Sequence, residues 1–217
     1  MFSIKSTKTQ VVALAVAGTI ALSSVLGAGT ALAYPNLAPN PSFESVNFSA
    51  TGPEIVGWAK ESKGTTNVHM GVSKFAADSD TSVYIVGSKS ANKGWPGFET
   101  NDIIPVDPSK EYTFSASYLS PEKYAGIPWM DMTLFDAAGN KLGAVSTGSS
   151  KPVLNEWQEK TYTFKPEALQ KHFPDIAGVK LGLKLSMNSG ITGIPKGQPV
   201  VLLYDNVTFE EIESDTP

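Results

Sequence analysis

Residues 179–188 read VKLGLKLSMN, and apolar and small or polar side chains alternate along the whole stretch. One side of the extended chain carries Val179, Leu181, Leu183, Leu185 and Met187. The other side carries Lys180, Gly182, Lys184, Ser186 and Asn188. Because successive side chains of a strand point to opposite faces, this alternation predicts a strand with one face in a core.

The same pattern recurs along the chain and determines the predicted fold class. It is strict in EYTFSASYL (111–119) and WMDMTLF (129–135), and shorter or more apolar strands are predicted at 82–86, 102–106, 160–164 and 200–209. A helix is predicted only at 166–173, and a hairpin turn is centred on Gly139-Asn140. We therefore expect an all-β protein, a two-sheet antiparallel β-sandwich. The alternation fits an immunoglobulin-like strand order and a jelly roll equally well.

The first 33 residues have the features of a secretory signal peptide. Lys5 and Lys8 precede an apolar stretch at 11–26, and Ala31-Leu32-Ala33 forms an A-x-A cleavage signal before Tyr34. A retained membrane anchor is the alternative. We expect a secreted, extracellular protein with no membrane attachment after cleavage, a sandwich at 34–211 and an acidic tail at 212–217.

Net charge and cysteine content exclude several classes of partner and of chemistry. The net charge is −4, and there is no cysteine. The acidic balance argues against nucleic acid and against anionic membrane surfaces as partners. The lack of cysteine excludes disulfides, thiol catalysis and thiolate metal sites, so stability must come from the core and from a metal if one is bound.

Several motifs, taken in order, resemble carbohydrate-binding modules of families 4, 9 and 22, which are galactose-binding-like jelly rolls. The motifs are NLAPNPSFE (36–44), Gly57-Trp58, KGWPGFE (93–99), NEWQEKTYTF (155–164) and VVLLYDNVTF (200–209). Two features depart from the family pattern: Ser109-Lys110 stands where a glycine is usual, and the connection at 188–199 is long. The resemblance implies a jelly roll that binds a polysaccharide or oligosaccharide.

The resemblance also implies a structural calcium away from the sugar site. By position, its ligands are Glu44, Asp78, Asp205 and the carbonyl of Thr81, with Asp80 as the rival of Asp78. Calcium accepts several hard oxygen ligands in irregular geometry, and a buried carboxylate at the end of VVLLY needs a partner. The alternative is that Glu44 and Asp205 cap loops by accepting backbone N–H groups.

The polar sides of the predicted strands supply candidate sugar-binding groups. If the apolar sides face the core, Trp129, Asp131, Lys184 and Asn188 share the outer face of one sheet. Sugars stack their C–H faces on aromatic rings and hydrogen-bond through their hydroxyls, so such a face suits a concave sugar site. The alternative is an ordinary solvated face with one surface tryptophan.

Trp95 lies in the loop that displays an aromatic ring to the ligand in the resembling modules. We expect Trp95 to contact ligand, with Asn92 beside it and Glu99 as a weaker candidate. Alternatively, Trp95 closes one end of the sandwich. In the predicted strand 111–119, Tyr118 falls on the same side as the other large apolar residues, which assigns it to the core. The family pattern assigns Trp58 to the core too.

Nothing in the sequence predicts a catalytic group. The chain has two histidines, His69 and His172, in unlike places, and no pair of carboxylates is identifiable. We therefore expect a non-catalytic binding protein that acts alone or beside separate glycan-active enzymes. Two alternatives remain: an envelope or matrix adhesion protein with a protein ligand, and a small polysaccharide lyase or hydrolase.

Overall fold

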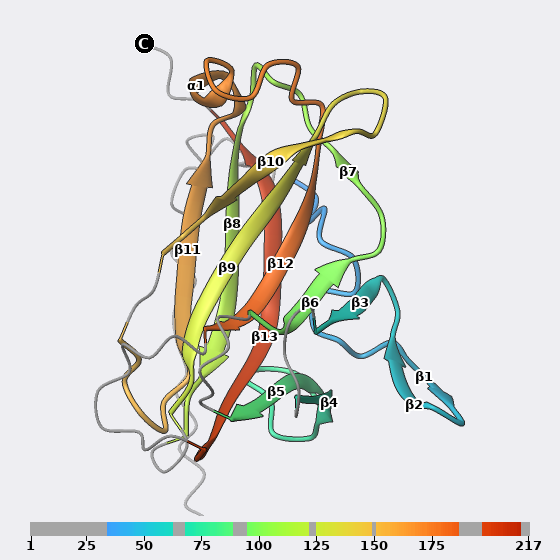
Figure 1. Cartoon of the computed structure of the whole chain (residues 1–217), viewed down its shortest axis with the longest axis vertical. Coiled ribbons are helices and arrows are strands. Elements are labelled where there is room, and N and C mark those ends of the chain that lie inside the picture. The colour runs from blue at the N-terminus through green and yellow to red at the C-terminus, as the bar shows by residue number, and fades with distance from the viewer. Residues whose placement is uncertain are drawn as a thin grey trace, which may run out of the picture. The chain divides into compact units, whose positions relative to one another are not determined.

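The computed structural model describes residues 34–62, 68–88, 95–121, 125–148, 151–186 and 197–213. The chain divides between Ala33 and Tyr34, and the unit from Tyr34 onward is the one shown as a coloured ribbon in Figure 1. The predicted signal peptide lies outside the described residues, and its removal stays a prediction.

Nearly all of the regular structure in this unit is β-strand. The strands are β1 (Val46–Ser49), β2 (Gly52–Ile55), β3 (Trp58–Glu61), β4 (His69–Ser73), β5 (Ser82–Ser88), β6 (Gly97–Thr100), β7 (Ile104–Pro105), β8 (Glu111–Leu119), β9 (Ile127–Phe135), β10 (Lys141–Ser146), β11 (Gln158–Phe164), β12 (Gly178–Ser186) and β13 (Pro199–Ile212). The helix α1 spans Pro166–Leu169. Among the described residues, no helix is long and apolar enough to cross a membrane.

The strands form two antiparallel sheets, which confirms the predicted sandwich. One sheet, here called the β9 sheet, has the order β10-β9-β12-β6-β3, and β7 also pairs with β12. The other, the β8 sheet, has the order β11-β8-β13-β5-β4. Strands β1 and β2 form a separate hairpin that projects beside the β9 sheet (Figure 1).

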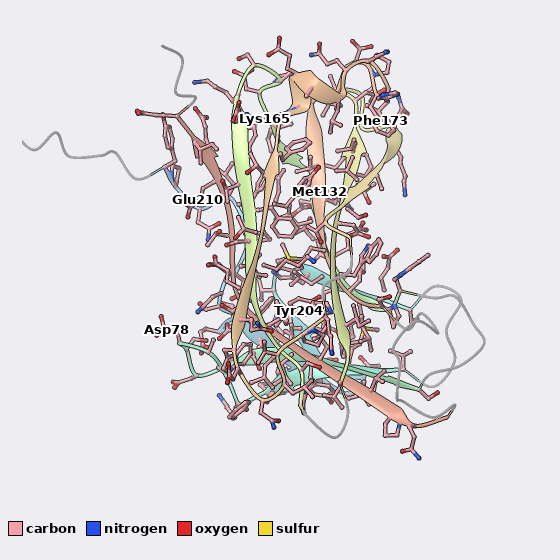
Figure 2. All side chains as sticks on the ribbon, turned by 90° about the vertical axis from the view of Figure 1, so that its left-hand side faces the viewer. Asp78, Met132, Lys165, Phe173, Tyr204 and Glu210 are labelled. Carbon is pink, nitrogen blue, oxygen red and sulfur yellow. The ribbon has the colours of Figure 1, made fainter. Side chains whose placement is uncertain are left out.

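The core lies between the two sheets. Leu181, Leu183 and Leu185 of β12 are fully buried, as the alternation of VKLGLKLSMN predicts. Met132 from the β9 sheet and Tyr204 from the β8 sheet are also buried and lie between the sheets in Figure 2. The inward side chains thus hold the two layers together by removing apolar surface from water.

Two predicted aromatic core residues are confirmed. Tyr118 keeps 4% of its surface exposed, and Trp58 also keeps 4%. The Trp58 indole N–H donates a hydrogen bond to the Pro39 carbonyl at 2.8 Å, which satisfies its polar edge inside the core. Neither ring is available to a ligand.

Two predicted elements are shorter than the sequence suggested. The strand predicted at 102–106 is reduced to β7, and the helix predicted at 166–173 ends at Leu169. Beyond Leu169 the backbone continues as a turn in which the N–H groups of His172 and Phe173 both donate to the Leu169 carbonyl at 2.9 Å. A segment of this length gains few hydrogen bonds of its own, so tertiary contacts decide its conformation.

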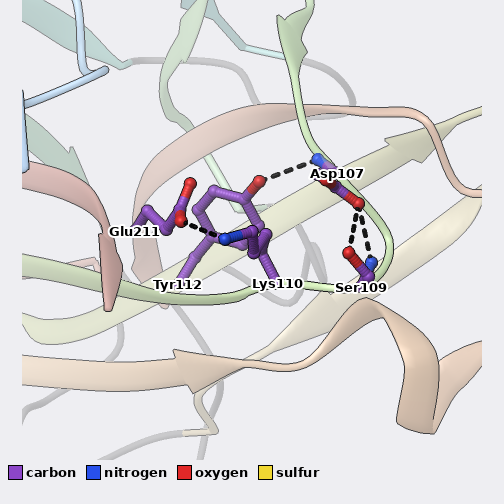
Figure 3. Close-up of polar contacts among 5 residues, drawn as sticks. All are labelled: Asp107, Ser109, Lys110, Tyr112 and Glu211. Atoms are coloured by element: carbon purple, nitrogen blue, oxygen red, sulfur yellow. Dashed lines mark hydrogen bonds and ion pairs between the residues drawn. The ribbon is translucent and has the colours of Figure 1, made fainter. Parts of the chain in front are cut away.

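The turn before β8 is closed without the glycine that is usual in the resembling family. The N–H and hydroxyl of Ser109 donate to the Asp107 carboxylate at 2.9 and 2.7 Å, and these bonds hold the pKa of Asp107 below its usual value (Figure 3). The Asp107 N–H donates to the Tyr112 hydroxyl at 2.7 Å, and Lys110 pairs with Glu211 of β13 at 3.0 Å. Side-chain hydrogen bonds therefore fix this turn in place of glycine flexibility.

Candidate functional site

The outer face of the β9 sheet, which points away from the β8 sheet, carries the polar side chains of several strands. Strand register aligns them in rows. In one row Trp129 of β9 lies opposite Lys184 of β12, then Gly97 of β6, then Glu61 of β3. Sequence parity correctly placed Trp129 and Lys184 on one face, but Glu61 was not predicted there, because β3 shows no strand pattern.

A second row lies next to the first. Asp131 of β9 is opposite Gly182 of β12, which is opposite Glu99 of β6. Both rows therefore contain a glycine between charged residues. A Cβ at Gly97 would lie 2.0 Å from the Leu183 carbonyl oxygen, so only glycine fits between β6 and β12 at that position.

Two tryptophan rings meet at one end of these rows. The ring centroids of Trp95 and Trp129 are 6.0 Å apart with an interplanar angle of 31°, and 47% of Trp95 is exposed. The Leu185 N–H donates to the Pro96 carbonyl at 2.8 Å, which ties the chain next to Trp95 to β12. Trp95 thus lies against the outer face of the sheet beside Trp129 rather than inside the core.

The backbone under Trp129 is held from the opposite sheet. The Tyr204 hydroxyl crosses the core, accepts the Trp129 N–H at 3.0 Å and donates to the Lys184 carbonyl at 2.7 Å. Burial raises the pKa of Tyr204 strongly, so the hydroxyl keeps its proton and stays a donor. Sequence reasoning missed this role, because Tyr204 sits in a continuous apolar run.

Lys184 is a buried cation in this face. Only 3% of its side chain is exposed, and its ammonium pairs with the Glu61 carboxylate, whose side chain is 24% exposed. The pair spans the position of Gly97, which has no side chain to block it. Lys184 was predicted as a ligand-binding group, and the structure places its ammonium in a buried ion pair with Glu61.

Asp131 lies directly over the Gly182 backbone. A Cβ at Gly182 would fall 1.7 Å from its Oδ1, and this oxygen is buried with no hydrogen-bond partner among the described residues. Burial is the main reason that the pKa of Asp131 rises to about 6. The Lys184 ammonium opposes this rise, and the carboxylates of Glu99 and Glu61 add to it.

The remaining predicted sugar contacts are placed as follows. Glu99 is on the same outer face and accepts a hydrogen bond from the Thr133 hydroxyl at 2.9 Å. Asn92 and Asn188 lie outside the described residues. A cavity of about 570 Å³ lies between the β1–β2 hairpin and β3, and none of the predicted sugar-binding residues lines it.

Four oxygen atoms surround one hydroxyl in the predicted calcium region. The Ser79 Oγ lies 3.0 Å from the Thr81 carbonyl, 3.4 Å from the Ser42 carbonyl, and 3.3 and 3.2 Å from the two carboxylate oxygens of Asp205. A hydroxyl has a single proton, so it satisfies one of these acceptors. The Glu44 carboxylate accepts the Thr81 hydroxyl at 3.3 Å and so lies next to the cluster. Carboxylate and carbonyl oxygens are the ligand types that calcium takes, so this cluster has the donor chemistry of the predicted site.

The loop-capping alternative is also visible in this region. Asp205 is fully buried and accepts backbone N–H groups from Ala77 and Asn206, each at 2.8 Å. Asp78 is exposed, as is its rival Asp80. In the described part of the chain, no group of three or more His, Asp or Glu side chains is arranged to hold a metal. A calcium site there would depend on Glu44, Asp205 and main-chain carbonyls.

Comparison with known proteins rests on structure, because no family model and no curated protein matches the sequence. The CBM22-1 xylan-binding domain of Paenibacillus barcinonensis Xyn10C superposes with a TM-score of 0.52 at 15% identity, over 84% of this chain and 97% of that domain. The fold is that of the family 22 carbohydrate-binding modules. The predicted resemblance is therefore confirmed at the level of fold.

The same fold occurs within larger proteins. The Clostridium thermocellum xylanase Xyn10B CBM22-1–GH10 structure, solved with xylohexaose, matches with a TM-score of 0.52 at 13% identity over 79% of this chain and 28% of that one. The enzymatically active domain of tailspike protein 4 of bacteriophage CBA120 matches at 0.56 and 16% identity, over 82% of this chain. This chain spans 21% of the tailspike chain.

Proposed function

We propose that the protein is a secreted, non-catalytic polysaccharide-binding protein. The observation that carries this proposal is the ring pair of Trp95 and Trp129 on the polar outer face of the β9 sheet. Two adjoining aromatic rings offer a platform for the C–H faces of sugar rings, and the carboxylates in the neighbouring rows offer acceptors for hydroxyls. The shared fold with xylan-binding modules supports a glycan ligand.

Affinity electrophoresis on soluble xylans, glucans and mannans tests the proposal. The wild-type protein should be retarded by at least one glycan, and Trp95→Ala and Trp129→Ala should each lose roughly 1 kcal/mol or more of binding free energy. Phe75→Ala is the matched control, because Phe75 is 59% exposed and stacks on Trp157 in a ring pair elsewhere. Retardation by no glycan overturns the proposal. Equal binding by all variants assigns the site to another surface.

Calcium is a further part of the proposal. The oxygen cluster around Ser79 supports a bound ion, with Glu44, Asp205 and the Thr81 carbonyl as its ligands. The ion would screen the buried Asp205 carboxylate and stabilise the loop that contains Ser79. Asp205 belongs to β13 of the β8 sheet, whereas Trp129 belongs to β9 of the other sheet, so the proposed role of the ion is structural.

One observation favours a second candidate, a glycoside hydrolase. Asp131 has a raised pKa, and Glu99 lies two strands away on the same face. Asp131 lies over Gly182 of β12, and Glu99 accepts the Thr133 hydroxyl of β9, so the two carboxylates face the same part of the sheet, as the carboxylate pair of a glycosidase does. Release of reducing ends from the same glycan panel would support this enzyme, and its loss in Glu99→Gln would assign the base. Binding without any release supports the non-catalytic proposal.

A further inference from the structure

Charge is unevenly distributed beside the tryptophan pair. Among the described residues, Glu61, Glu99 and Asp131 place three carboxylates on the two rows nearest the rings, and Lys184 places one ammonium there. That ammonium is already paired with Glu61 and is almost completely buried. In the described part of the chain, the accessible charge on these two rows is therefore mainly that of carboxylates.

The other lysines of this face lie farther from the rings. Lys180 is on β12 one row beyond Asp131, and its ammonium donates to the Asn101 carbonyl at 2.7 Å. Lys141 of β10 lies opposite Phe135 in the strand register, at the far end of β9 and four residues beyond Asp131. Neither ammonium forms an ion pair with Asp131 within 4.0 Å among the described residues. In the described part of the chain, Lys184 and Lys141 thus act on Asp131 only from beyond ion-pair distance.

Asp131 lacks the donors that a buried carboxylate normally has. It accepts no hydrogen bond from the described residues, yet its Oδ1 is enclosed above Gly182 and part of the side chain remains exposed. It stands two residues from Trp129 on the same side of β9, roughly 7 Å along the strand. A cationic N–H donor at this position would contact an aromatic ring and a carboxylate together.

We propose that this face selects glycans with free amino groups, such as a polymer of 2-amino-2-deoxyhexose, and that Asp131 recognises the ammonium. The proposal rests on the proposed function, because it concerns the same site. An ammonium at the exposed part of the Asp131 carboxylate supplies a charged donor and a positive charge beside an anion that accepts no hydrogen bond from the described residues. An N-acetylated sugar keeps one donor and loses the charge, and a uronic acid brings a second anion next to the three carboxylates, which is unfavourable.

Binding measured by calorimetry on four oligosaccharides of equal length tests this selectivity. The probes are a β-1,4-linked glucosamine oligomer, its fully N-acetylated form, a xylo-oligosaccharide and an oligogalacturonate. We expect the glucosamine oligomer to bind about tenfold more tightly than the N-acetylated form, the gain of one charge-assisted hydrogen bond, and the galacturonate to bind least. Equal or tighter binding of any other probe overturns the amine selectivity.

Variants locate the selectivity at Asp131. Asp131→Asn keeps the shape of the side chain and should abolish the tenfold advantage of the glucosamine oligomer while neutral oligomers still bind. Glu159→Gln is the matched control, because Glu159 is an exposed carboxylate on β11 of the other sheet and its loss changes the net charge equally. If both variants lose the advantage of the glucosamine oligomer equally, the attraction comes from the overall charge alone, and the role of Asp131 is overturned.

The outcomes separate this inference from the proposed function. If neutral oligomers bind and depend on Trp95 while the amine has no advantage, the binding function stands and the selectivity fails. If no probe binds, both fail. The amine advantage should also shrink below about pH 6, where Asp131 gains a proton. The groups that face Asp131 are Lys184 and Gly182 of β12, Glu99 of β6, Glu61 of β3 and Lys141 of β10.

Discussion

The buried ion pair between Lys184 and Glu61 makes the sharpest prediction about stability. Lys184→Met keeps the unbranched stem and removes only the ammonium, so packing changes little. The change removes the ammonium that pairs with Glu61 and that lowers the pKa of Asp131. Removing one partner of a fully buried pair costs about 3–5 kcal/mol. Because 24% of the Glu61 side chain is exposed, we expect about 2–4 kcal/mol here.

Urea unfolding at neutral pH measures this loss, and thermal unfolding should show a melting temperature lower by roughly 5–15 °C. Lys180→Met is the control on the same strand and the same face. Its ammonium contacts a main-chain carbonyl and its side chain is partly exposed, so its loss should cost less than about 1 kcal/mol. The double variant Lys184→Met/Glu61→Gln should recover part of the loss, because it removes the carboxylate that Lys184 pairs with as well.

Acid pH separates the electrostatic cause from a packing defect. Once Glu61 and Asp131 are protonated, the missing ammonium has no carboxylate to balance, so the difference between wild type and Lys184→Met should become small. A loss of stability that stays constant with pH would show instead that the methionine side chain packs poorly in the variant. Equal losses in Lys184→Met and Lys180→Met at neutral pH would refute the role assigned to the buried pair.

Three further predictions concern single side chains. Gly182→Ala should return the pKa of Asp131 toward its usual acidic value, since the new Cβ forces the carboxylate out toward solvent, and an NMR titration measures it; an unchanged pKa near 6 contradicts the placement. The pKa of Asp131 is raised from 3.8 to about 6 in the folded protein, so between these values the folded state holds a proton that the unfolded state has lost. The contribution of Asp131 to the free energy of unfolding therefore falls as pH rises from about 4 to 6, by up to about 3 kcal/mol. The difference between wild type and Asp131→Asn in unfolding experiments across that range measures this; a constant difference refutes it. EDTA should lower the melting temperature of a calcium-loaded preparation and leave Asp205→Asn unaffected; if wild type does not respond, there is no structural calcium.

The sequence predicted the long strands well, for a physical reason. Strands β8 and β12 each have one face in the core, so their side chains must alternate, and the pattern is visible without any partner. Strands β3 and β6 have four residues each, WAKE and GFET, and carry no such pattern. They are strands because of the neighbours they pair with, and pairing over long sequence separations cannot be seen in the residues themselves.

The same limit explains which site residues were missed. Parity placed Trp129, Asp131 and Lys184 on one face, because they lie on strands that the sequence predicts. Glu61 became visible only once β3 was paired with β6. Tyr204 was counted as one more buried residue, since its hydrogen bonds under Trp129 depend on the distance between the sheets.

Two polar side chains of β12 are almost as buried as its apolar ones, so they are not available for direct contact with a ligand. Lys184 and Ser186 point away from the core, yet each is 3% exposed, which is close to the leucines on the opposite side of the strand. A ligand on this face therefore meets Trp95, Trp129 and the accessible parts of Asp131 and Glu61 before it meets Lys184. The ammonium pairs with the Glu61 carboxylate, and the Tyr204 hydroxyl donates to the Lys184 carbonyl below it. If the proposed site binds a charged glycan, we therefore expect selectivity to come from the accessible part of Asp131, and not from a direct contact between Lys184 and the glycan.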